Sequence, residues 1–278
     1  MGKYSKEPTK KTGRGVWIAV LVISLLVLVG AAILLLPQLL SAPAHSSGVD
    51  EEALPTLTDA EPASAVPEET AAEETRSLAE NPIDWAEYTE LNEDVYAWIV
   101  IPGTGIDLPV LQAHGEMDDN FYLHHDINGN YLFAGEIYSQ KANAKDFTDR
   151  VTVLYGHNMK REGERFTNLL YFEDETFFRE HEFFYIYTPD RVYTYLIASA
   201  HAYDTRHILN NFDFDKDEDF QEYLDTILSP RTVIANVREG VELTLDDHIV
   251  TLSTCTYVNN DKIRYLVQGV LVDEQPTE

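Results

Sequence analysis

The sequence predicts a mainly β protein of the α+β class that is preceded by one transmembrane helix. From residue 81 onward, short β-rich runs are separated by turn signals, and few stretches show helical periodicity. Near the N-terminus, a segment of 21 residues carries no charge. Many short strands with few helices are typical of a β-barrel or a β-sandwich with helical insertions.

The uncharged segment, Val16–Leu36, is long enough to cross a bilayer core, because a helix of this length extends about 30 Å. Residues 1–15 hold five basic side chains and one acid, and basic flanks remain in the cytoplasm. We therefore expect a cytoplasmic tail at 1–15, a membrane anchor at 16–40 and the rest of the chain outside. A cleaved signal peptide is the alternative, since Ala42–Ala44 resembles a small-residue cleavage site, but its apolar region would be unusually long.

Residues 41–80 have a composition unlike that of their neighbours. They hold ten acidic residues against a single basic residue, Arg76, together with four prolines, nine alanines and no aromatic residue. Such a segment cannot bury enough apolar surface to offset its ordering entropy. We predict an extended, self-repelling spacer that holds the folded domain, residues 81–278, away from the membrane.

The charge and the cysteine count exclude several classes of protein. The chain has 48 acidic and 20 basic residues, for a net charge of −28, and such a chain repels phosphate backbones, so we expect no nucleic-acid partner. One cysteine excludes an intramolecular disulfide and a multi-cysteine metal site. The acidic residues are scattered without a calcium-loop spacing, and we predict no metal and no cofactor.

The folded domain is expected to begin with a helix, because Asp84 and Glu87 have the spacing of a capping box before an apolar run. Helical periodicity recurs near Glu164–Phe172 and over Asp217–Leu228. Thr188–Arg191 is a turn signal that joins two strands as a hairpin. The predicted strands are Trp98–Ile101, Leu108–Leu111, Gly135–Tyr138, Val151–Tyr155, Phe183–Tyr187, Val192–Ala198, His248–Thr254 and Ile263–Val272.

The lone cysteine, Cys255, stands at the end of an apolar strand pattern in Thr251–Tyr257, which reads Thr-Leu-Ser-Thr-Cys-Thr-Tyr. A free cysteine is often a buried small hydrophobe, but a side chain at a strand end can reach a cleft and act as a reactive thiol. A thiol nucleophile needs a base or a cation nearby. Arg264 opens the next apolar strand, and antiparallel pairing would place it beside the cysteine, where it could stabilise a thiolate or an oxyanion.

Nine histidines are available as the base. His157 stands out because it follows an apolar strand that breaks at a glycine, in the stretch Tyr-Gly-His-Asn. His124 and His125 lie in a polar loop and are interpreted as ordinary surface or hydrogen-bonded histidines.

The cysteine segment, the upstream Tyr155–Asn158 and the arginine nine residues after the cysteine together resemble the sortases, cysteine transpeptidases of the Gram-positive cell surface. The chain is most similar to class B over residues 82–273. Trp98–Gln112 resembles the early strands of that class, and Tyr155–Phe166 resembles its histidine segment. Asp217–Leu228 resembles the helix that is inserted before the cysteine strand.

The resemblance implies a closed eight-stranded β-barrel in which Cys255, His157 and Arg264 meet at one groove. Cys255 would attack the threonine carbonyl of a C-terminal sorting signal, LPxTG- or NPxTx-like, on a secreted protein. His157 would protonate the leaving amine and then accept a proton from the incoming one, while Arg264 would hold the substrate and the oxyanion. An amine of the peptidoglycan precursor, lipid II, would then resolve the thioester.

The resemblance also implies substrate contacts and a location. Ser253 matches a position that contacts substrate in this class, and Asn120 and Leu123 are expected to line the groove. With residues 16–36 in the membrane, the enzyme would be a single-pass protein of the cell membrane, with its N-terminus in the cytoplasm and its catalytic domain outside.

Three alternatives stay open at this point. A pilus-polymerising sortase would join pilins through a lysine; Pro82–Trp85 holds the aspartate and aromatic residue of a class C lid, although a helix cap explains them more simply. A papain-like or cell-wall peptidase is disfavoured, because His157 precedes Cys255 by 98 residues and both place the cysteine before the histidine. A membrane-tethered binding domain with an inert cysteine would be separated from any enzyme by thiol labelling of the folded protein.

Overall fold

Nine strands are present in the computed structural model, which describes residues 78–159, 164–255 and 263–277. Their bounds are β1 (Val95–Ile101), β2 (Ile106–Leu111), β3 (Ile137–Tyr138), β4 (Val151–Tyr155), β5 (Phe183–Tyr187), β6 (Arg191–Tyr203), β7 (Ala235–Val237), β8 (Ile249–Cys255) and β9 (Arg264–Pro276). They form one sheet in the order β5-β1-β2-β3-β4-β8-β9-β6-β7.

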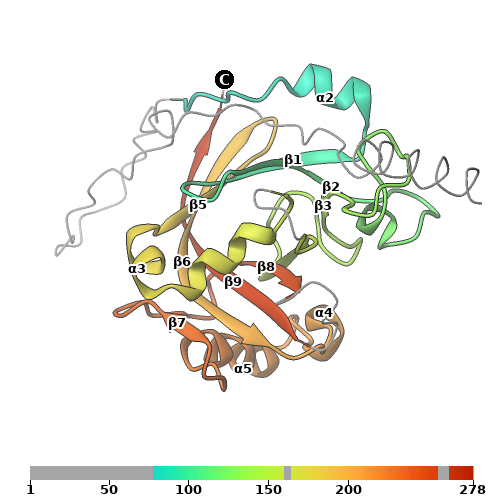
Figure 1. Ribbon diagram of the computed structural model, residues 1–278. Coiled ribbons are helices and arrows are strands. Elements are labelled where there is room, and N and C mark those ends of the chain that lie inside the picture. The colour runs from blue at the N-terminus through green and yellow to red at the C-terminus, as the bar shows by residue number, and fades with distance from the viewer. Residues whose placement is uncertain (1–77, 160–163, 256–262, 278) are drawn as a thin grey trace, which may run out of the picture. The chain divides into compact units, whose positions relative to one another are not determined.

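The sheet closes on itself, because β5 also pairs with β6. Eight strands therefore form a closed barrel, and β7 is added to the edge of β6 (Figure 1). Neighbouring strands are antiparallel except for the pairs β2–β3 and β4–β8, which are parallel. The closed eight-stranded barrel confirms the fold that the resemblance implied.

Alternate side chains of every barrel strand point inward and fill the interior, as expected for a barrel of this size. The buried residues that represent each of the eight strands are Ile99, Leu108, Ile137, Leu154, Phe184, Tyr195, Val250 and Val267.

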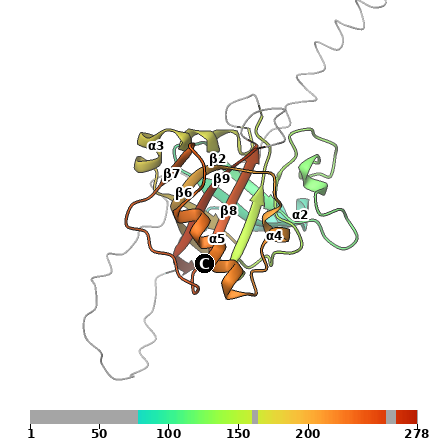
Figure 2. The same ribbon diagram turned by 90° about the horizontal axis from the view of Figure 1, so that it is seen from below.

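Short helices cover the outside of the barrel on two opposite sides (Figure 1). On one side, α2 (Trp85–Leu91) packs Tyr88 against Trp98 of β1, with 4.7 Å between ring centroids. On the other side, α5 (Asp217–Leu228) buries one apolar face against the outer surface of β4, β6, β8 and β9. The view from below shows α5 and α4 (Ile208–Asn211) lying across these strands (Figure 2).

Most predicted elements are present. The Asp84 side chain accepts a hydrogen bond from the Glu87 backbone N–H at 3.0 Å and begins α2 as a capping residue. Helix α5 and strands β4 and β5 have the predicted bounds, and the predicted hairpin joins β5 to β6. Strands β6 and β9 are longer than predicted, because they pair with each other from Arg191 opposite Pro276 to Tyr203 opposite Arg264.

Two regions differ from the prediction. The helical pattern near Glu164–Phe172 is a 3-10 helix, η3 (Thr167–Glu173), followed by α3 (Glu175–Glu180). A helix cannot begin earlier, because Arg165 has a φ of +50°, outside the right-handed helical region. Strand β7 was not predicted. Its three residues are all half-buried, so they lack the alternation of buried and exposed residues by which a strand is recognised in a sequence.

Within the part of the chain that the structure describes, no helix is both long enough and apolar enough to span a bilayer. The predicted anchor Val16–Leu36 and the predicted spacer lie outside the described residues.

Candidate active site

One cavity of about 450 Å³ opens at the end of the barrel where β4, β8, β9 and β6 meet. The six residues that the sequence singled out for the site all line it. These are Asn120, Leu123, His157, Ser253, Cys255 and Arg264.

Regular strand pairing places the thiol beside the guanidinium. Cys255 is the last residue of β8, Arg264 is the first residue of β9, and the two lie opposite each other in the antiparallel register. Arg264 Nη1 donates a hydrogen bond to Cys255 Sγ at 2.8 Å. A guanidinium at this distance stabilises negative charge on the sulfur, which is the nucleophilic form of a cysteine.

His157 reaches the cavity from a corner that follows β4. The parallel register of β4 and β8 places Tyr155 opposite Ser253, and the Gly156 N–H donates to the Ser253 carbonyl at 3.1 Å. Asn158 Nδ2 then donates to the Cys255 carbonyl at 2.8 Å. The chain that leaves β4 is thereby held along the end of the cysteine strand.

Only glycine fits at the start of this corner. A Cβ at Gly156 would lie 2.5 Å from Ile137 Cδ1 and 2.8 Å from Phe166 Cδ2, distances at which the neighbours must move. Close packing against Ile137 and Phe166 therefore explains why a glycine interrupts the strand pattern at this position.

The His157 ring is neutral at physiological pH. Its pKa is lowered from 6.5 to about 4, chiefly by burial and also by the neighbouring His124 and by the charges of Arg264 and Arg165, against a hydrogen bond to the Leu123 backbone that raises it. His157 Nε2 is buried and has no hydrogen-bond partner among the described residues, so Nδ1 makes the bond to Leu123. The proton of the neutral ring therefore sits on Nδ1, and the lone pair of Nε2 is left to accept a proton.

Two aromatic side chains confine the His157 ring. Its centroid lies 5.2 Å from that of His124 and 5.6 Å from that of Phe133. The interpretation of His124 as an ordinary loop histidine was therefore incomplete. The reason is that the connection between β2 and β3 packs against the corner after β4, a contact that no local pattern reveals.

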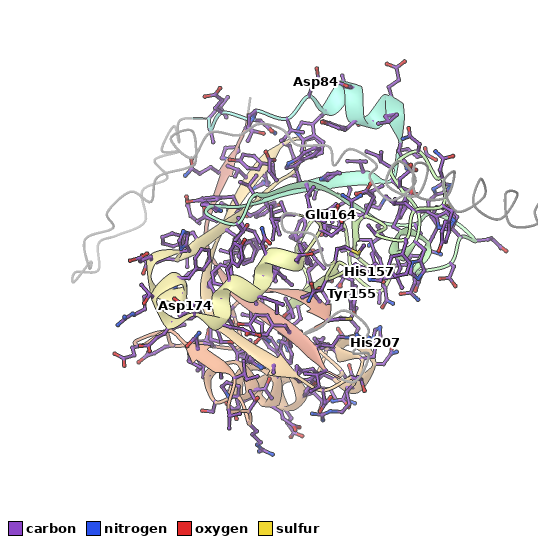
Figure 3. The ribbon with its side chains drawn as sticks, in the orientation of Figure 1. Asp84, Tyr155, His157, Glu164, Asp174 and His207 are labelled. Carbon is purple, nitrogen blue, oxygen red and sulfur yellow. The ribbon has the colours of Figure 1, made fainter. Side chains whose placement is uncertain are left out.

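The turn between β6 and α4 supplies residues that the sequence did not indicate. His207 lines the same cavity, 6.0 Å from the ring of Tyr155, and Figure 3 shows both with His157 on one side of the barrel. Neither His207 Nδ1 nor the Tyr155 hydroxyl has a hydrogen-bond partner within the described ranges, although both atoms are buried. The pairing of Tyr203 with Arg264 brings this turn to the site, and no spacing in the sequence indicates it.

The remaining predicted residues form the walls. Asn120 precedes the 3-10 helix η2 (Phe121–Leu123), and its Oδ1 accepts hydrogen bonds from Tyr138 Oη at 3.1 Å and Gln140 Nε2 at 3.0 Å. Ser253 is 6% exposed and stands two residues before the cysteine. No group of three or more His, Cys, Asp or Glu side chains in the described part of the chain is arranged to hold a metal ion.

Residues 99–272 match the family model of the sortase domain, and the chain therefore belongs to the sortase family. Sortase B of Listeria monocytogenes is 33% identical over 184 residues, which cover 66% of this chain and 72% of that protein.

Solved structures agree with this assignment. Clostridium perfringens sortase B is 30% identical, with a TM-score of 0.59 over 68% of this chain and 99% of that one. A Staphylococcus aureus sortase B–substrate complex is 26% identical, with a TM-score of 0.58 over 68% and 84% of the two chains. The fold, the family and these relatives define a cysteine transpeptidase of the sortase B class, and they exclude the binding domain with an inert cysteine.

Proposed function

We propose that this chain is a membrane-anchored sortase that cleaves a C-terminal sorting signal after threonine and transfers the protein to an amine of the cell-wall peptidoglycan precursor. The observation that supports this most directly is the 2.8 Å hydrogen bond from Arg264 Nη1 to Cys255 Sγ, in a cavity that His157 also lines.

In the first half of the reaction, Cys255 Sγ forms a bond to the threonine carbonyl carbon. His157 Nε2 takes the thiol proton and gives it to the leaving amine as the amide C–N bond breaks, which leaves a thioester. The neutral ring described above suits this order of events, because it begins with a free lone pair. Arg264 stabilises the negative charge that develops on the sulfur and on the carbonyl oxygen.

In the second half, an amine attacks the thioester carbon, and the C–S bond breaks. His157 Nε2 accepts the proton that the amine loses, and the proton returns to the sulfur as the new amide leaves. Asn120, Leu123 and Ser253 hold the sorting signal along the walls of the cavity, which has room for a short peptide segment.

The domain arrangement fits this reaction. Residues 16–40 would anchor the chain in the cell membrane, with 1–15 in the cytoplasm, and the acidic spacer 41–80 would hold the catalytic domain, 81–278, outside near its substrates. Secreted proteins with sorting signals and the lipid-linked precursor would meet there.

The test is to trap the acyl-enzyme. Purified protein is incubated with a library of sorting-signal peptides, and its intact mass is measured. We expect a mass gain on Cys255 that hydroxylamine removes, and no gain in Cys255→Ala. A Cys255→Ala variant that retains transpeptidation would overturn the proposal.

The acceptor is identified in the same assay. Adding a wall-precursor stem peptide should release the acyl group as a new amide, whereas a lysine-bearing pilin segment should not. Release by the pilin segment alone would instead identify a pilus-polymerising enzyme.

A further inference from the structure

A buried ion pair lies beside the cavity without lining it. Arg165 Nη2 is 3.1 Å from Glu136 Oε1, and each residue is only 3% exposed. Burying two charges is costly, and apolar residues of similar volume often stabilise a fold as well or better. The pair therefore needs an explanation other than stability.

The arginine backbone is joined to the corner that carries His157. Arg165 pairs with Asn158 in an isolated antiparallel bridge, and the next residue, Phe166, donates its N–H to the His157 carbonyl at 3.1 Å. Arg165 adopts a φ of +50°, which is unfavourable for a residue with a Cβ. The conformation turns the chain back along the corner so that the guanidinium enters the protein.

The arginine side chain is joined to the opposite wall of the cavity. Arg165 Nε donates to the Gly135 carbonyl, and the Glu136 N–H donates to the Tyr122 carbonyl at 2.8 Å. Gly135 has a φ of +56°, and a Cβ there would lie 2.3 Å from the Leu123 carbonyl oxygen. Two stretches of the β2–β3 connection, at Tyr122–Leu123 and at Gly135–Glu136, thus pack backbone against backbone. Arg165 is attached to this contact close to the hydrogen bond between Leu123 and the His157 ring.

We propose that the Glu136–Arg165 ion pair is a positioning element that sets the distance between the Leu123 backbone and the His157 ring. By holding Nδ1 of His157 on Leu123, it keeps Nε2 directed into the cavity with its lone pair free. Neither residue touches the substrate; both act through His157. The inference rests on the proposed function, in which His157 exchanges protons with the two amines.

The test replaces the pair with apolar residues of similar size, Glu136→Leu together with Arg165→Met. Because no charge is left unpaired, this double variant should fold, which urea denaturation checks. We expect kcat to fall by about tenfold or more with little change in KM, since small displacements of a catalytic group have large effects on rate. Imidazole ¹⁵N shifts at pH 7 should show His157 moving from the Nδ1–H tautomer toward Nε2–H.

A second ion pair, which is more exposed and lies elsewhere, provides the control. Arg238 Nη1 lies 2.8 Å from Glu182 Oε1, and Arg238 also donates to the Ile197 and Phe178 carbonyls, away from the cavity. Glu182→Leu with Arg238→Met should leave both kcat and the His157 tautomer unchanged.

A double variant at Glu136 and Arg165 with wild-type kcat and an unchanged His157 tautomer would overturn the proposal. A lower kcat in this variant with an unchanged tautomer would also overturn it. So would an equal fall in kcat and an equal tautomer change in the Glu182 and Arg238 control. If the double variant does not fold, Arg165→Lys retains the charge but loses the fork that reaches both Gly135 and Glu136, and the same tautomer change is expected. The tautomer is measured without substrate. The test of the ion pair therefore remains valid even if the acyl-enzyme test of the proposed function fails.

Discussion

The two sides of the catalytic cavity are built in different ways. On one side, Cys255 and Arg264 are opposed residues of two paired strands, and the backbone ladder alone places them. On the other side, His157 and Leu123 lie outside the strands, and side chains such as those of Asn158 and Arg165 hold them. The strand side should therefore tolerate changes in its surroundings, whereas the corner side should depend on a few particular contacts.

The largest effect is expected on the strand side, when the guanidinium that stabilises the developing negative charge is removed. Arg264→Ala should lower turnover about 10²- to 10³-fold, the usual loss for a donor that stabilises developing charge, with an unchanged circular dichroism spectrum. Arg264→Lys should recover little, because an ammonium lacks the forked donors of a guanidinium.

A matched control is available on the same strand system. Arg191 opens β6 at the end remote from Tyr203, and it pairs with Glu274 at 3.0 Å. Arg191→Lys should leave turnover unchanged. A fully active Arg264→Lys would show that position and charge suffice, and that the forked contact has no role.

The corner side can be tested by adding one methyl group. Gly156→Ala should destabilise the fold by about 1–3 kcal/mol, because its Cβ would meet Ile137 and Phe166. It should also lower turnover about tenfold by displacing His157 relative to Cys255. Urea denaturation and steady-state kinetics measure the two effects.

Gly240→Ala is the control for this substitution. No atom lies within 4 Å of a Cβ there, and the only cost is its φ of +81°. It should lose some stability without losing turnover. If Gly156→Ala were destabilised but fully active, the corner would be more tolerant than the comparison implies.

A third test concerns the burial of His157. Its pKa is about 4 in the folded protein and about 6.5 when exposed, so between these values the unfolded chain binds a proton that the folded chain does not. The free energy of unfolding should therefore fall as the pH drops from 6.5 to 4.5. His157→Gln should reduce this fall by about 2 kcal/mol, measured by urea denaturation at both pH values. Equal pH slopes for both proteins would contradict the buried, neutral ring.

The same contrast explains how far the sequence predicts the site. Strand patterns were enough to expect Cys255 and Arg264 side by side, because one ends an apolar strand, the other opens the next, and antiparallel pairing brings those two ends together. His207 and the partner of Arg165 were not predictable, since their positions follow from pairings between distant strands and from the path of irregular connections. The resemblance to sortases, and not local periodicity, led to Asn120, Leu123 and Ser253.

The parallel pairing of β4 with β8 also affects how the enzyme matures. Arg264 can join Cys255 through a short-range pairing, but His157 arrives from 98 residues upstream and only when two parallel strands have met. Contacts between such distant segments must overcome loop-closure entropy before they stabilise the fold, and they form slowly. A chain in which β4 has not yet met β8 therefore carries its thiol without this proton acceptor, and it can react only after the two strands have paired.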